Sequence, residues 1–218
     1  MQSDSAIRAG VRAALPIVLP SVALGISFGI LARPVMGSIA PIAMSIAVFS
    51  GGAQFAALSV LQGGGAAFAA ITAGMLMNAR WIPMSLAMTP SLHGGRLRRA
   101  GEAQAIVDAS FGISDRGDGS FDRGLLLGAT LPQVVSWVGG TIIGVLAAGR
   151  MGDPNAFGLD AVFPAFYLAL LVRESGGRRA YEAMALAAVI TIVVTAFAPP
   201  GVPVIVASSA ALLGLRSR

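Results

Sequence analysis

Residues 38–62, with the sequence SIAPIAMSIAVFSGGAQFAALSVLQ, decide the fold of this chain. The segment is long and apolar enough to enter a membrane, where a spanning helix needs about 20 apolar residues. Its middle is interrupted by Ser50-Gly51-Gly52-Ala53-Gln54. Two adjacent glycines and a glutamine at this position predict a helix break or a tight hairpin.

The composition of the whole chain indicates an integral membrane protein. Of its 218 residues, 56% are hydrophobic and 11% are charged, and the mean hydropathy is +0.79. A soluble domain carries about 25% charged residues, so these few charges do not cover the surface of a water-soluble globule. We therefore expect an all-α, polytopic membrane helix bundle that forms one transmembrane domain over residues 1–218.

Six further apolar segments are predicted, namely residues 13–32, 66–88, 124–148, 157–172, 183–198 and 202–215. The longest polar stretch, residues 93–123, is rich in arginine and has a weakly amphipathic piece around residues 103–113. If all seven segments crossed from a cytoplasmic amino terminus, this stretch would lie outside, against the positive-inside rule.

A re-entrant segment at residues 38–62 removes this conflict. It places twelve arginines on the cytoplasmic side and two, Arg33 and Arg150, on the outer side. We therefore expect about six crossings plus one broken or re-entrant helical segment, with both termini cytoplasmic.

The interruption itself is the first candidate binding site. A broken helix presents backbone N–H groups at the new helix start, and these groups favour a carboxylate. The candidate binding residues are Ser50, Gly51, Gly52 and Gln54, of which Gln54 adds a side-chain donor and acceptor. The alternative is a packing kink that binds no ligand.

Asn78 and Arg80 are the second candidate, near the end of an apolar segment. Arg80 is either an interfacial anchor, or a counter-charge for a substrate carboxylate or for Asp108. Asp108 and Asp160 lie beside apolar stretches and are candidates for proton coupling; the alternative for each is an exposed loop or a helix cap.

Two proline-containing pairs, Pro132-Gln133 and Phe163-Pro164, lie inside apolar segments. Each proline frees a backbone carbonyl, so we expect these residues to break a helix, to line a cavity or simply to bend a helix.

Several chemistries are excluded. Cysteine is absent and His93 is the one histidine, so thiol chemistry and multi-histidine metal sites are ruled out. No Walker loop or dinucleotide fingerprint is present, and we expect no cofactor. The net charge of +5 is assigned to arginines at an anionic lipid surface, not to nucleic-acid binding.

The stretch Gly25-Ile26-Ser27-Phe28-Gly29 matches the G-x-S-x-G pattern of hydrolases. That motif needs a strand-to-helix turn and a histidine partner, whereas this stretch lies in an apolar span. Gly25 and Gly29, like Gly140 and Gly144, fit instead the small-xxx-small spacing of packed membrane helices. We therefore expect no enzymatic activity.

Three stretches together resemble a known family. They are Val48-Phe49-Ser50-Gly51-Gly52-Ala53-Gln54-Phe55, Asn78-Ala79-Arg80-Trp81 and Asp160-Ala161-Val162-Phe163-Pro164-Ala165-Phe166. The chain resembles the AzlC family, the large subunit of bacterial branched-chain amino acid exporters. The resemblance implies a small hydrophobic AzlD-type membrane subunit as partner, and a location in the bacterial inner (cytoplasmic) membrane.

The expected function is export of branched-chain or other small apolar amino acids by gradient-driven alternating access. The substrate class comes from the resemblance, and the gradient is inferred because no nucleotide-binding motif is present. Two alternatives stay open: a channel or permease for another small solute, and a membrane scaffold that transports nothing.

Overall fold

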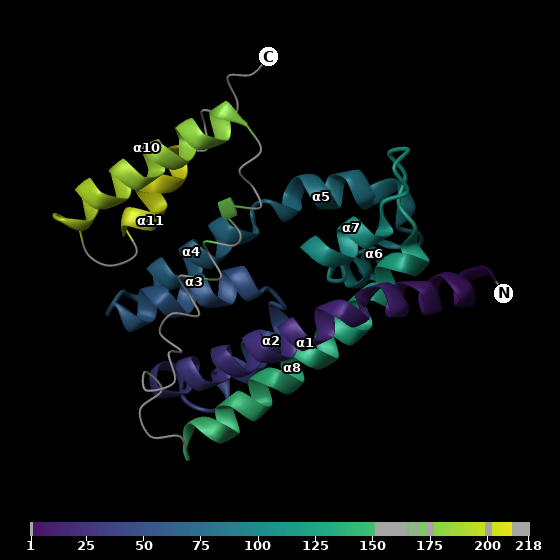
Figure 1. Ribbon diagram of the computed structural model, residues 1–218, viewed down its shortest axis with the longest axis horizontal. Coiled ribbons are helices and arrows are strands. Elements are labelled where there is room, and N and C mark those ends of the chain that lie inside the picture. The colour runs from purple at the N-terminus through teal and green to yellow at the C-terminus, as the bar shows by residue number, and fades with distance from the viewer. Residues whose placement is uncertain are drawn as a thin grey trace. The chain divides into compact units, whose positions relative to one another are not determined.

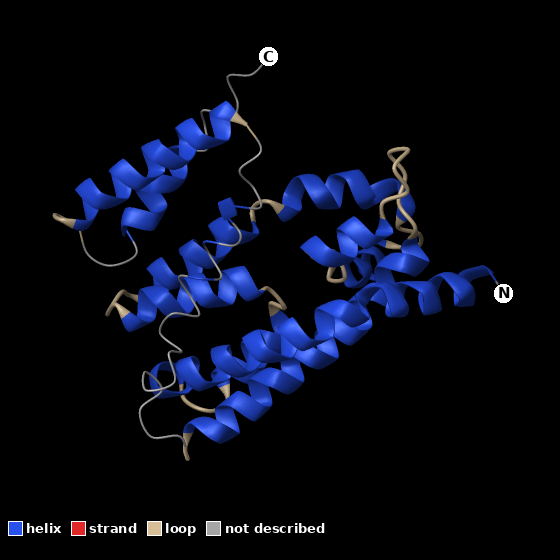
Figure 2. Ribbon diagram, viewed as in Figure 1, coloured by secondary structure: helices blue, strands red, loops and turns tan. Residues whose placement is uncertain are grey.

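The computed structural model describes residues 2–150, 177–198 and 202–210, together with Ala165, Leu168, Leu171 and Val172. All regular elements in this part of the chain are helices, which confirms the all-α prediction (Figure 1, Figure 2). The helices are α1 (Gln2–Met36), α2 (Ala40–Ala47), α3 (Gly51–Gln62), α4 (Ala67–Asn78), α5 (Trp81–Met88), the 3-10 helix η1 (Thr89–Ser91), α6 (Arg96–Ala103), α7 (Asp108–Ser114), α8 (Arg123–Ala148), α10 (Arg178–Thr195) and α11 (Val202–Ala207).

The chain divides into two compact units. The first unit contains Met1–Gly51 and Asn78–Gly152, and the second contains Gly52–Met77 and Asp153–Arg218. The first unit therefore holds α1, α2 and α5 to α8, and the chain leaves it at the start of α3 and returns at the end of α4.

Helices α1 and α8 form the core of the first unit. Among the described residues, they are the two helices with the length and apolar composition to cross a membrane. This finding does not establish the six crossings expected from the sequence. Asp122 caps α8 by accepting a hydrogen bond from the Leu125 N–H at 3.0 Å, which fixes where the helix begins.

Glycines hold α1 and α8 at backbone contact. A Cβ atom added at Gly25 of α1 would lie 2.6 Å from the carbonyl oxygen of Trp137 in α8. One added at Gly140 of α8 would lie 2.6 Å from the carbonyl oxygen of Val22. Similar contacts involve Gly29 and Gly144, so the predicted packing of these four glycines is confirmed.

The two helices run parallel. Ile7 of α1 lies against Gly128 of α8, and Ile26 lies against Gly144, so residue numbers increase together along both helices. A membrane crossed by both helices would be crossed in the same direction. The intervening residues, 37–122, would then contain an odd number of crossings, and the start of α8 would share the side of the amino terminus.

The polar stretch between α5 and α8 folds against the start of α8. The weakly amphipathic piece around residues 103–113 contains the end of α6 at Ala103, a connection, and α7 from Asp108 onwards. Ser110 and Thr130 both donate to the carbonyl of Ala105 in the connection, at 2.5 and 2.8 Å. These bonds satisfy a buried carbonyl that a continuous helix would have used internally.

Candidate functional site

The predicted interruption after α2 is present. Helix α2 ends at Ala47 and α3 begins at Gly51, so the break itself lies at residues 48–50 and the glycine pair starts the new helix. Phe49 has a φ of +44°, in the left-handed region that non-glycine residues rarely adopt. Holding such a residue costs about 1–2 kcal/mol, so the surrounding structure imposes this turn.

A second interruption lies at residues 79–80. The sequence predicted one segment over residues 66–88, but α4 ends at Asn78 and α5 begins at Trp81. Pro83 supplies the physical reason, because it has no N–H to donate to the carbonyl of Ala79 and its ring disfavours a helix through that residue. The Ala79 carbonyl accepts instead from the Ile82 N–H at 3.1 Å.

A hydrogen bond joins the two interruptions. The buried Ser50 hydroxyl donates to Oδ1 of Asn78 at 2.6 Å. Ser50 is the last residue before α3 and Asn78 is the last residue of α4. The chain therefore leaves the first unit and returns to it at the same place.

This meeting point lies near the middle of α8. A Cβ atom added at Gly51 would lie 2.8 Å from Cη2 of the Trp137 ring, and Trp137 is midway along α8. Towards the carboxyl end of α8, Ser45 of α2 shares a 2.9 Å hydrogen bond with Thr141. Helix α2 thus runs antiparallel to α8, and the chain reaches the middle of α8 where α2 ends.

Helix α5 continues in the same direction. It starts beside the meeting point, and its last residue, Met88, belongs to one buried apolar cluster with Leu92, Ile106 and Leu126 near the start of α8. Helix α2 therefore packs along the second half of α8, and the end of α5 packs beside the start of α8 through Met88.

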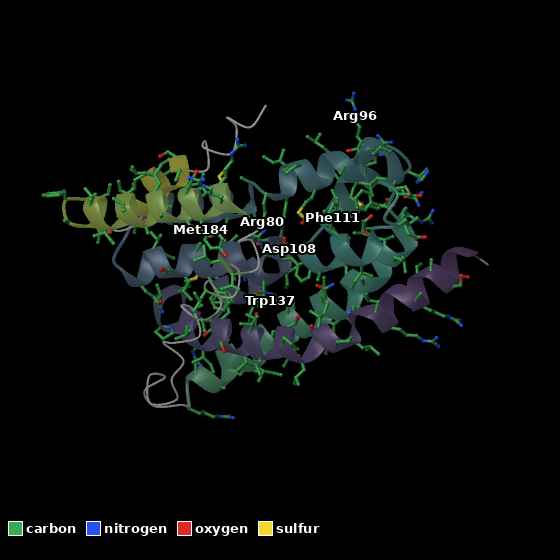
Figure 3. All side chains as sticks on the ribbon, turned by 45° about the horizontal axis from the view of Figure 1, so that its top comes forward. Arg80, Arg96, Asp108, Phe111, Trp137 and Met184 are labelled. Atoms are coloured by element: carbon green, nitrogen blue, oxygen red, sulfur yellow. The ribbon has the colours of Figure 1, made fainter. Side chains whose placement is uncertain are left out.

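Arg80, the residue before α5, is paired with Asp108, the first residue of α7 (Figure 3). Its Nε donates to Oδ1 of Asp108 at 3.0 Å and its Nη2 donates to Oδ2 at 2.7 Å. The two side chains are 31% and 30% exposed, so the pair is neither sealed in the core nor freely solvated. A two-point ion pair of this kind fixes the plane of the guanidinium as well as its position.

Four helix ends meet at the two interruptions. The carboxyl ends of α2 and α4 carry partial negative charge, and the amino ends of α3 and α5 carry partial positive charge. Ser50 and Asn78 add polar side chains and Arg80 adds a full positive charge. The arrangement therefore offers both signs of charge within a short distance of the middle of an apolar helix.

The other predicted residues have varied locations. Gly52 and Gln54 belong to the first turn of α3 in the second unit, where Gln54 is fully buried. Helix α8 runs through Pro132 without interruption, and the Gln133 side chain donates to the Ala129 carbonyl at 2.8 Å. Pro132 lines a shallow apolar groove between α1 and α8 of about 330 Å³. The remaining predictions, Asp160, Phe163 and Pro164, lie outside the described residues.

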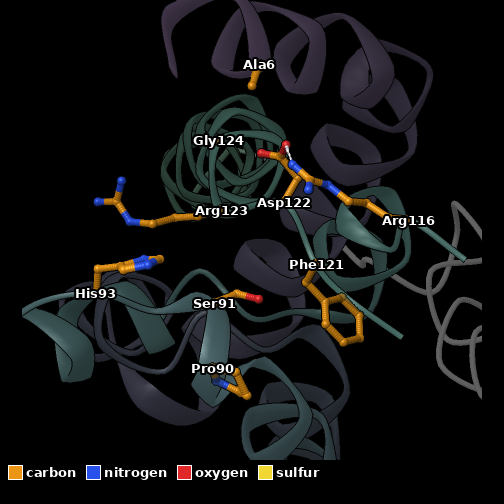
Figure 4. A pocket seen from close by; sticks show the side chains of 9 residues that line it. All are labelled: Ala6, Pro90, Ser91, His93, Arg116, Phe121, Asp122, Arg123 and Gly124. Carbon is orange, nitrogen blue, oxygen red and sulfur yellow. Dashed lines mark hydrogen bonds and ion pairs between the residues drawn. The ribbon is translucent and has the colours of Figure 1, made fainter. Parts of the chain in front are cut away.

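A polar cavity of about 490 Å³ lies at the start of α8, away from the interruptions (Figure 4). Its lining includes His93, Arg116 and Arg123, and none of the residues predicted to bind substrate. The positive charges there are already paired: Arg116 with Asp122, and Arg123 with Glu102. In the described part of the chain, no three acidic or histidine side chains are placed to hold a metal ion.

Glu102 fastens α6 to α8. It accepts hydrogen bonds from Arg123 Nε at 2.8 Å and from Arg98 Nε at 3.0 Å. The bonds from Arg123, and then those from Arg98, outweigh desolvation and lower the pKa of Glu102 to about 2. The carboxylate therefore stays charged at neutral pH and holds the polar stretch in place.

Three residues of the meeting point had not been proposed for it from the sequence: Phe49, Trp81 and Pro83. Pro83 was the available signal for the second interruption, since a proline two residues into a helix fits its first turn and disfavours helix before it. Nothing in the sequence marks Phe49, because its left-handed conformation is imposed by tertiary structure.

Comparison with known proteins identifies the family. A family model described as "AzlC protein" matches residues 16–151. "Branched-chain amino acid transport protein AzlC" of Bacillus subtilis (strain 168) is 28% identical over 182 residues, which cover 80% of this chain and 71% of the relative. An "Uncharacterized membrane protein" of Archaeoglobus fulgidus is 28% identical over 197 residues, which cover 87% and 85%. No solved structure matches the chain significantly. The chain therefore belongs to the AzlC family.

Proposed function

We propose that this chain is the transport subunit of an exporter for branched-chain or other small apolar amino acids. The observation that carries the proposal is the meeting of four helix ends at the Ser50–Asn78 hydrogen bond, two residues from the Arg80–Asp108 ion pair. Transporters place their binding sites at such interrupted helices. The substrate class follows the name of the Bacillus subtilis relative.

A free amino acid matches the charges at this place. Its carboxylate would bind Arg80 and the amino end of α3 at Gly51. The sequence also predicts Gly52 and Gln54 as binding residues. Its ammonium group would face the partially negative ends of α2 and α4, beside Asn78. A zwitterion satisfies both signs at once, whereas a simple anion or cation satisfies one.

Arg80 is able to bind a substrate while it stays paired. Asp108 occupies Nε and Nη2, and Nη1 has no bond to any described residue. A second carboxylate would bind on that side, with Asp108 keeping the guanidinium oriented. We therefore assign Asp108 first to the positioning of Arg80. A proton-coupling role for Asp108 or Asp160 remains part of the proposal.

The cellular setting follows from the family resemblance and from the charges. We propose the bacterial inner membrane, cytoplasmic termini, an outward direction of transport and a small hydrophobic AzlD-type partner. Transport would proceed by alternating access, driven by an ion or proton gradient. The parallel packing of α1 and α8 supports this topology, since two helices that cross in the same direction would have the arginine-rich stretch before α8 on the side of Arg8 and Arg12.

Efflux of radiolabelled valine or leucine from proteoliposomes tests the proposal. Arg80→Ala and Gly52→Leu are expected to lower efflux at least tenfold with membrane insertion intact. Arg178→Ala is the matched control, because Arg178 is 93% exposed and its described ion pair is with Glu182, one turn away. Normal efflux in Arg80→Ala and Gly52→Leu would refute the site. Absence of amino acid efflux with flux of another small solute would favour a channel or permease, and absence of any flux would favour a scaffold.

A further inference from the structure

Trp81 carries a buried donor that the proposed function has not used. Trp81 is the first residue of α5 and directly follows Arg80. Its indole Nε1 is shielded from solvent and meets no hydrogen-bond acceptor in the described structure. Among the buried side-chain nitrogen and oxygen atoms of the described residues, it alone lacks a partner.

A donor of this kind requires an acceptor. A buried N–H without an acceptor is destabilising, and native structures seldom leave one without a bound water, ion or ligand nearby. Inside a membrane protein the cost is higher, since lipid offers no acceptor. The Trp81 N–H is therefore available to an added acceptor at the start of α5.

The positive charges next to Trp81 favour an anionic acceptor. The amino end of α5 carries partial positive charge, and Arg80 carries a full one. The backbone of this turn has few donors to give, because Ile82 N–H is already bonded to Ala79 and Pro83 has none. The indole N–H at position 81 therefore supplies a hydrogen-bond donor that the backbone of the first turn of α5 lacks.

We propose that the indole N–H of Trp81 donates a hydrogen bond to the carboxylate of the amino acid substrate, beside Arg80. This inference rests on the proposed function and adds a binding residue to it. Arg80 would supply the charge, and Trp81 a donor of fixed direction. An acceptor lacking the negative charge, such as an alcohol in the same place, would bind less well.

The two tryptophans of the chain allow a direct test. The full chain is labelled with nitrogen-15 at its tryptophan indoles, so two indole N–H signals arise. The signal missing from the Trp81→Phe spectrum belongs to Trp81, and the Trp137 signal serves as the internal reference. L-Leucine is titrated, and then L-leucinol, which keeps the side chain and the ammonium group but replaces the carboxylate by an alcohol.

Leucine is expected to move the Trp81 signal downfield, and leucinol is expected to leave it in place. Trp81→Phe is expected to weaken leucine binding about tenfold, and Trp81→His, which keeps a ring N–H donor, to restore part of it. Binding of radiolabelled leucine is measured separately on the same samples. Leucine binding with an unmoved Trp81 signal, or with full affinity in a folded Trp81→Phe protein, overturns the inference and leaves the proposed function standing. Absence of leucine binding to the unmodified chain overturns both.

Discussion

Arg80 forms a two-point ion pair with Asp108, which lies 28 residues later in the sequence. Its Nε donates a hydrogen bond to one carboxylate oxygen at 3.0 Å, and its Nη2 donates to the other at 2.7 Å. The pair connects the second interruption to the first residue of α7. It thus ties the interior of the helix bundle to the folded polar stretch before α8. A change at either residue should alter how the other is held.

Substitutions at Arg80 and Asp108 distinguish a role in substrate binding from a purely structural ion pair. Asp108→Asn keeps Arg80 charged but removes its anchor, and we expect the KM for leucine efflux to rise about tenfold, or ~1.4 kcal/mol. The exchange Arg80→Asp with Asp108→Arg restores the ion pair and is expected to restore thermal stability without restoring efflux. Recovery of efflux in the exchanged protein would show that the pair is structural and binds no substrate.

Two adjacent glycines of α8 give a matched test of the packing with α1. Gly140→Ala places a methyl group 2.6 Å from the Val22 carbonyl, whereas Gly139→Ala meets nothing within 4 Å. We expect Gly140→Ala to destabilise the protein by about 1–3 kcal/mol. Gly139→Ala should be neutral or mildly stabilising, since alanine is the better helix former. Thermal unfolding in detergent measures both, and equal melting temperatures would contradict the close contact.

Glu102 predicts a pH dependence of stability. The pKa of Glu102 in the folded protein is about 2, below its ordinary value of 4.5, so its contribution is complete above pH 4.5 and is lost as the pH falls towards 2. The difference in melting temperature between the unmodified chain and Glu102→Gln should therefore shrink over that range.

The control for this effect is Glu182→Gln, because Glu182 is 54% exposed in its pair with Arg178. That variant should match the unmodified chain throughout the titration. A difference for Glu102→Gln that is constant with pH would mean that the Arg98 and Arg123 contacts do not stabilise the charged carboxylate.

Single cysteines test the topology, because the chain has none of its own. Ser38→Cys follows the end of α1, and Gly95→Cys precedes α6 at a position where a side chain meets nothing within 4 Å. Parallel α1 and α8 place these positions on opposite sides of the membrane. In intact cells, a membrane-impermeant maleimide should label Ser38→Cys, and should label Gly95→Cys only after permeabilisation. Labelling of both positions from one side would rule out an odd number of crossings between α1 and α8.

The parts of the architecture that local chemistry decides were predictable from the sequence. The interruption near Gly51 and Gly52 and the glycine packing of Gly25, Gly29, Gly140 and Gly144 depend on backbone freedom and side-chain size, both visible in a sequence. The second interruption was also signalled, by Pro83, but the apolar run around it suggested one continuous segment.

Other features depend on contacts between distant residues. The Ser50–Asn78 hydrogen bond and the parallel direction of α1 and α8 follow from how segments meet, and hydrophobic patterning does not specify this. The polar stretch before α8 appeared to be a loop, yet it folds around Glu102 and the buried carbonyl of Ala105. The pairing of Arg80 was left open between two partners for the same reason.

The most direct test of the account is the position of a bound substrate. An experimental structure of the full chain with L-leucine, in lipid and together with any subunit that co-purifies, should show the amino acid where α2, α3, α4 and α5 meet. Its carboxylate should lie within hydrogen-bond distance of Arg80, and its ammonium group on the side of Asn78. Leucine bound elsewhere, for example in the groove at Pro132 or the polar cavity at His93, with the interruptions closed around their own hydrogen bonds, would contradict the account.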